Sequence, residues 1–181
     1  MFPREEIYWL ALNKAPGIGS RRFYKLIKTF DDPKQVWQAG LSELSQVIGR
    51  KIAMDFIEFR RKFSVDEEWE RLEKGGFKIL LVKDRNYPGL LKKIHDPPPV
   101  LYYRGEFRPE DQFAVAVVGS RAATPSGLSI ARELAADLAV QGITVVSGLA
   151  RGIDSAAHRG ALSVKGGRTI AVLGCGIDRV Y

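Results

Sequence analysis

The chain has 181 residues, of which 45% are hydrophobic and 27% charged, so it can form the core of one large or two small globular domains. Its single cysteine, Cys175, excludes an internal disulfide, and no apolar run is long enough to span a membrane, so we expect a cytoplasmic protein. The formal net charge of +7 suits a polyanionic partner.

Residues 1 to 63 are predicted to form a small all-helical domain, which is helical from residue 4 onward. Apolar residues recur at helical spacing from Phe23 to Phe30, directly after a glycine-containing hairpin at residues 15 to 19. This pattern resembles a helix-hairpin-helix, in which the glycine turn directs backbone N–H groups at a phosphate without reading bases. The candidate DNA contacts in this domain are Gly17, Gly19, Arg21, Arg22 and Lys25. A purely structural or protein-binding helical domain explains the same residues equally well.

A second domain is predicted to begin at residue 64 and to continue to residue 181. A charged helix over residues 66–73 is followed by an apolar strand over 77–82, a short helix over 90–94 and another strand over 100–103. We expect these two strands to extend the sheet described next. Several aromatic side chains here could stack on bases, but we expect them to be packed instead: Trp69, Tyr87, Tyr102 and Tyr103.

From residue 113 onward the chain alternates strands and helices. Strands are predicted over residues 115–118, 143–146 and 169–173, with Thr124 capping a helix that ends at Gly142 and a shorter helix from about Asp154 through Leu162. Such alternation implies right-handed crossovers and a parallel sheet, so the fold class is α/β and Rossmann-like. The glycine loops that follow the three strands should therefore meet at one edge of the sheet.

This edge is the candidate ligand site. Glycine loops that lead into helices present backbone N–H groups and partial positive charge, which suits phosphate, and two arginines add full charges. The candidate phosphate-binding residues are Gly119, Ser120, Arg121, Ser147, Gly148, Arg151 and Gly152. The glycines alone would also be explained by tight turns. Arg121 favours a ligand site because a cation just beyond a strand end has no obvious role in packing.

The order of these strings resembles the DNA-processing protein A family (DprA, also called Smf). The resemblance rests on Val118 to Arg121, Ser147 to Asp154, Ala157-His158, Thr169 to Leu173 and Gly176 to Tyr181, with Arg85 to Pro88 and Asp96 to Tyr102 upstream. It implies a Rossmann-like domain, incomplete at its carboxyl end in this chain, and a helical accessory domain similar to a sterile alpha motif.

The resemblance also implies a function without catalysis. A member of the family would bind and protect single-stranded DNA and help load the RecA recombinase during natural transformation, as a homodimer and without a cofactor. By the family pattern, Ser120 and Arg121 match the phosphate-contacting loop, and Gly119, Gly148 and Gly152 shape the pocket. Because no helix is predicted to follow the third strand, we expect an uncovered sheet surface, weak DNA binding and self-association of this chain by itself.

Enzyme classes find less support in the sequence. The dinucleotide fingerprint and the Walker-type lysine are absent, and neither glycine-loop serine lies in a hydrolase elbow. Asp154 and His158 stand four residues apart, but we expect Asp154 to cap its helix, His158 to pack or bond locally, and Cys175 to be a buried, inert thiol. A metal site is not predicted because too few ligands are available.

Two other function classes stay open on the sequence alone. A Rossmann-like nucleotide-binding enzyme or sensor, similar to a phosphoribohydrolase, could use the same glycine edge and Arg121. A protein adaptor could act through the amino-terminal helices. Binding to an oligonucleotide, to a mononucleotide or to neither separates the three classes.

Overall fold

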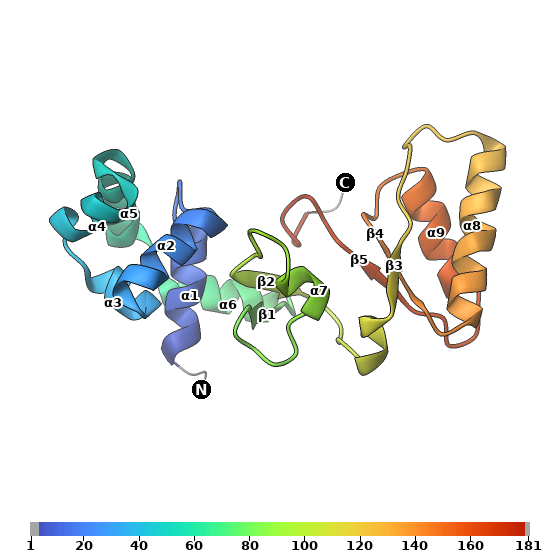
Figure 1. Ribbon diagram of the computed structural model, residues 1–181, viewed down its shortest axis with the longest axis horizontal. Coiled ribbons are helices and arrows are strands. Elements are labelled where there is room, and N and C mark those ends of the chain that lie inside the picture. The colour runs from blue at the N-terminus through green and yellow to red at the C-terminus, as the bar shows by residue number, and fades with distance from the viewer. Residues whose placement is uncertain (1–3, 180–181) are drawn as a thin grey trace. The chain divides into compact units, whose positions relative to one another are not determined.

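The chain divides into two compact units, Met1–Gly105 and Glu106–Tyr181, and the computed structural model describes residues 4–179 of them (Figure 1). The boundary predicted between residues 63 and 64 falls inside the first unit. The physical reason is that Leu81 and Val100 share one apolar core with the preceding helices. Val180 and Tyr181, the end of the last family string, lie outside the described residues.

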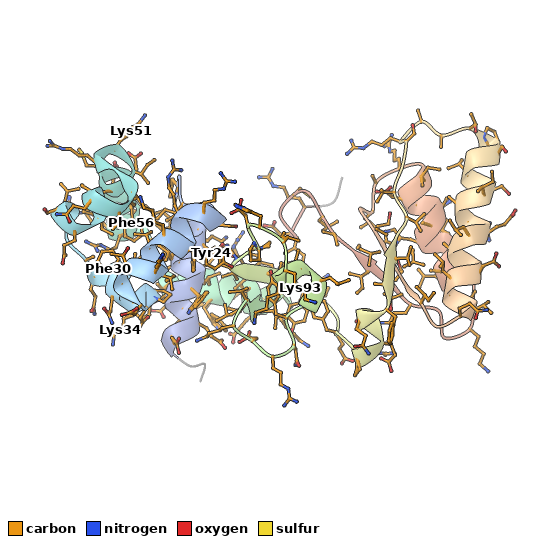
Figure 2. The ribbon with its side chains drawn as sticks, in the orientation of Figure 1. Tyr24, Phe30, Lys34, Lys51, Phe56 and Lys93 are labelled. Atoms are coloured by element: carbon orange, nitrogen blue, oxygen red, sulfur yellow. The ribbon has the colours of Figure 1, made fainter. Side chains whose placement is uncertain are left out.

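The first unit begins with helices, as predicted. They are α1 (Arg4–Lys14), α2 (Ser20–Phe30), α3 (Pro33–Gln38), α4 (Leu41–Ile48), α5 (Arg50–Lys62) and α6 (Val65–Lys74). Phe23 and Phe56 are fully buried at the centre of this unit, and each such side chain contributes about 1.5–3 kcal/mol. In Figure 2, Phe56 lies among the helices, whereas Lys34 and Lys51 point outward.

The first unit ends with a small sheet of its own. Strands β1 (Lys78–Leu81) and β2 (Val100–Tyr103) pair antiparallel, with the short helix α7 (Gly89–Lys92) between them. The expectation that these strands extend the parallel sheet was wrong, because each pairs only with the other among the described strands. Tyr87 is buried and donates its hydroxyl to the Pro98 carbonyl at 2.8 Å, so its predicted packing role is confirmed.

The second unit contains the predicted parallel sheet. After a short 3₁₀ turn, η1 (Pro109–Gln112), the elements are β3 (Ala114–Ala116), α8 (Pro125–Val140), β4 (Thr144–Ser147), α9 (Ile153–Leu162) and β5 (Thr169–Ala171). The strand order is β3-β4-β5, and both pairings are parallel. Helix α8 begins as the sequence indicated, since the Thr124 hydroxyl accepts a hydrogen bond from the Gly127 N–H at 3.2 Å.

Both helices lie on the same side of the sheet (Figure 1). This follows from the strand order, because two right-handed crossovers that advance in one direction place their helices on one face. The two helices meet through small residues, and a Cβ on Gly160 would lie 2.1 Å from the Arg132 carbonyl oxygen. Val118 and Val172, which lie just beyond the ends of β3 and β5, are exposed.

Candidate nucleic-acid interface

The glycine loops after β3 and β4 are held together at the carboxyl edge of the parallel sheet. The Val117 N–H donates to the Val146 carbonyl at 2.9 Å, and the Ser147 hydroxyl donates to the Val117 carbonyl at 2.7 Å. Ser147 is buried, so it ties the strands together where they end. Of the predicted phosphate-binding residues, it is the one whose hydroxyl already has a partner inside the sheet.

The first loop carries an exposed serine and an exposed arginine. Gly119, Ser120 and Arg121 all lie at the surface. The Ser120 hydroxyl oxygen accepts a hydrogen bond from the Ala122 N–H at 3.1 Å, which fixes the turn that leads toward α8. The Ser120 hydroxyl proton and the Arg121 guanidinium are therefore two hydrogen-bond donors that this loop offers to an anion.

The second loop packs directly on the first. Gly152 has a φ of +80°, and a Cβ at this position would lie 2.2 Å from the Ser120 carbonyl oxygen. The Ile153 N–H donates to that same oxygen at 3.2 Å. No residue except glycine fits this approach without moving the first loop. The structure therefore brings the predicted residues Ser120, Arg121 and Gly152 together.

Leu149 and Arg151 form the exposed part of the second loop. Leu149 has a φ of 59°, which is uncommon for a residue with a side chain, and its side chain is 51% exposed. Arg151 is also exposed. Sequence reasoning named Arg151 as a candidate on this loop but could not predict the backbone of Leu149, because a left-handed conformation at a leucine has no signal in the sequence.

Asp154 does not cap its helix, contrary to the prediction. Gly152 occupies the N-cap of α9, and the buried Asp154 carboxylate instead accepts N–H groups from the two loops, at 3.4 Å from Gly119 and 3.1 Å from Gly148. The sequence pattern could not reveal this contact because it joins residues 35 positions apart.

His158 is packed, as predicted, but its bond is not local. Its Nδ1 lies 2.7 Å from the Thr169 hydroxyl on β5, and that hydroxyl donates to the Val145 carbonyl. Because the Thr169 hydroxyl proton is donated to the Val145 carbonyl, the His158 ring must donate its Nδ1–H to the hydroxyl oxygen. Burial lowers the pKa of His158, against the opposing effect of the Asp154 charge. The ring is therefore neutral at physiological pH and acts as a structural link between α9 and β5.

The third loop follows β5 and contains Cys175. The thiol is exposed, so the expectation of a buried cysteine was wrong. Its environment is a surface turn in which the sulfur lies 3.8 Å from the Arg179 carbonyl oxygen. Within residues 4–179, no three potential metal ligands gather at one point. Nor does any helix in that range have the length and apolarity needed to cross a bilayer.

In the first unit, the predicted hairpin leads into α2. Gly17 has a φ of +74°, and the Arg22 guanidinium donates to the Gly17 carbonyl at 2.8 Å. The Arg21 guanidinium pairs with Asp96 at 2.8 Å, and this pairing lowers the pKa of the Asp96 carboxyl. Arg21, Arg22 and Asp96 line a shallow hollow together with Gly19 and Ser20. Lys25 is exposed one turn further along the helix.

Comparisons with known proteins agree on one family. The family model described as DNA recombination-mediator protein A matches residues 78–181. Protein Smf of Synechocystis is 36% identical over 183 aligned residues, which cover 98% of this chain and 46% of that protein.

Two solved structures are also similar. The crystal structure of DNA processing protein A from Streptococcus pneumoniae aligns with a TM-score of 0.78 at 31% identity, over 97% of this chain and 60% of that one. A structure that describes the single-stranded DNA binding mode of DNA processing protein A from Helicobacter pylori aligns with a TM-score of 0.50 at 33% identity over 58% of this chain and 46% of that one. This chain thus spans about half the length of these relatives. With its Rossmann-like sheet and its family strings, the chain belongs to the DprA/Smf family of DNA-processing proteins.

Proposed function

We propose that this chain binds single-stranded DNA through the two glycine loops at the carboxyl edge of its parallel sheet. The observation that carries the proposal is the position of Arg121 and Arg151, two exposed cations on loops that are packed against each other. The backbone of the second loop turns through positive φ angles at Leu149 and Gly152. The single-stranded DNA binding named for the Helicobacter pylori relative supports the same ligand.

Binding of this kind should depend little on base sequence. Arginine and hydroxyl groups recognise phosphate, which is the same at every nucleotide. Preference for single strands over a duplex is expected because a flexible strand can bend to meet two loops on one edge. We infer no catalytic role. Asp154 and His158, four residues apart on α9, are buried and bonded to the protein itself.

The wider role is also a proposal. We expect a cytoplasmic homodimer that protects incoming single strands and helps load RecA during natural transformation. The family description, a recombination mediator, supports this role. Accelerated RecA filament formation on single strands, with this chain added before RecA, would test it separately from DNA binding.

The direct test is fluorescence anisotropy with a labelled oligo-dT. The proposal predicts saturable binding that unlabelled oligo-dT competes away, with weaker competition by duplex DNA of the same length. Free nucleotides should not compete. Strong competition by a mononucleotide would favour the nucleotide-binding enzyme instead, and equal competition by duplex DNA would contradict the single-strand preference.

A further inference from the structure

A single buried carboxylate connects the two loops of the proposed DNA site. Asp154 is 7% exposed, and its two oxygens face different loops: Oδ1 accepts from the Gly119 N–H at 3.4 Å and Oδ2 from the Gly148 N–H at 3.1 Å. A Cβ on Gly148 would lie 2.7 Å from Oδ2. Each loop thus begins with a glycine whose N–H faces this carboxylate.

These two contacts change which groups are left for phosphate. A glycine loop binds an anion through its free N–H groups, but here the first N–H of each loop already faces an internal anion. DNA phosphates must therefore be met farther along the loops, where Ser120, Arg121 and Arg151 are exposed.

Contacts with Asp154 and its neighbour Ile153 determine the position of the Arg121 backbone. Ser120, its neighbour, has its carbonyl oxygen bonded to the Ile153 N–H, one residue before Asp154. Gly119, two residues before Arg121, is bonded to Asp154 itself. The Arg121 segment is thereby fixed at both of these points by the first turn of α9.

We propose that Asp154 is a positioning residue for single-stranded DNA binding, which holds the two loops in the register that places Arg121 against a phosphate. The inference rests on the proposed function. The direction in which DNA affinity changes when the Asp154 charge is removed is informative, because a carboxylate beside a phosphate site repels the ligand. If repulsion dominated, removing the charge would tighten binding. If positioning dominates, removing it weakens binding.

Asp154→Asn tests the two possibilities with almost no change in shape. Asparagine keeps one carbonyl oxygen, but its NH₂ group must face one of the two backbone N–H groups. We expect this variant to bind oligo-dT about five- to tenfold more weakly than the unmodified chain. Asp137→Asn, at an exposed position on α8, removes the same charge away from the loops and should leave affinity unchanged.

A double-mutant cycle shows whether the effect passes through Arg121. In an Arg121→Ala background the position of the missing guanidinium no longer matters, so adding Asp154→Asn should change affinity by less than about twofold. An equal loss in both backgrounds, or tighter binding by Asp154→Asn, would overturn the proposal.

Amide NMR spectra keep the inference testable if the variant is unstable. The Gly119 and Gly148 resonances of the unmodified chain should both shift on Asp154→Asn, together with Ser120 and Arg121, while amides of the first unit stay in place. A shift confined to Gly148 would contradict a link between the loops. If the unmodified chain bound no oligo-dT at all, the proposed function would fail, whereas normal binding by Asp154→Asn would defeat this inference alone.

Discussion

Arg168 and Asp111 form a two-point ion pair at the end of the parallel sheet opposite the glycine loops. Nε lies 2.5 Å from Oδ1 and Nη2 lies 2.6 Å from Oδ2, and the Thr144 hydroxyl also donates to Oδ1 at 3.0 Å. The pair joins the turn before β3 to the residue before β5. Asp111 thereby links all three strands at this end, as Asp154 links two loops at the other.

Arg168→Ala should destabilise the second unit by about 2 kcal/mol, because it leaves a mostly buried carboxylate without its charged donor. The three tryptophans, Trp9, Trp37 and Trp69, all lie in the first unit, so their fluorescence does not report this change. Hydrogen exchange of the β4 amides measures it. Arg159→Ala, at an exposed position on α9, is the control, and equal exchange rates in the two variants would contradict the role of the pair.

The same pair predicts acid sensitivity. Burial by itself would raise the pKa of Asp111, but the Arg168 guanidinium, the Arg108 N–H and the Thr144 hydroxyl together lower it. A lowered folded-state pKa gives stability that is complete above the unfolded value of about 4 and is lost as the pH falls through the folded value. Asp111→Asn should therefore flatten the loss of second-unit stability below about pH 4. If the stability of the second unit fell with pH as steeply in Asp111→Asn as in the unmodified chain, this role of Asp111 would be refuted.

His158 should titrate below the pH of about 6.5 that is usual for a histidine side chain, because burial lowers its pKa against the opposing effect of the Asp154 charge. The unfolded chain takes up this proton at about pH 6.5, so stability is complete above that pH and falls as the pH decreases toward the folded-state pKa. Following the ring C–H signals of His158 by NMR as the pH is lowered measures its titration directly. Titration of His158 at or above about pH 6.5 would contradict the buried, neutral ring.

Gly152→Ala should destabilise the second unit by at least about 2 kcal/mol, since it combines a positive φ with a Cβ that meets the Ser120 carbonyl. Gly174→Ala is a matched control on the loop after β5, where an added Cβ meets no atom within 4 Å. Hydrogen exchange of the β4 amides again gives the comparison. Similar protection in both variants would show that the first loop yields easily to the second.

The hairpin of the first unit should contribute less to DNA binding than the glycine loops. Arg21 and Arg22 are already bonded to Asp96 and to the Gly17 carbonyl, so a phosphate must compete with these partners. Replacing Arg21, Arg22 and Lys25 together by alanine should weaken oligo-dT binding less than Arg121→Ala does, measured at one fixed salt concentration. A larger loss in the triple variant would move the principal DNA contact to the first unit.

Local signals predicted the helices and the parallel sheet well. The start of α8 could be read from Thr124 and Pro125, because a side-chain cap and a proline at the first position are local features. The pairing of β1 with β2 could not be predicted from local features. Whether these strands join one sheet or another depends on which hydrophobic core contains Leu81 and Val100. Asp154 shows the same limit at the site: its position favoured a cap, and its true partners lie on other loops.

The most direct test of the central claim is the salt dependence of oligo-dT binding by Arg121→Ala, compared with Arg132→Ala. Both side chains are exposed arginines of the second unit, but Arg132 lies in the middle of α8, away from the loops. If Arg121 neutralises one phosphate, the slope of log affinity against log salt should shrink by about 0.7 in Arg121→Ala and stay unchanged in Arg132→Ala. An unchanged slope and affinity in Arg121→Ala would contradict a DNA site at this edge of the sheet.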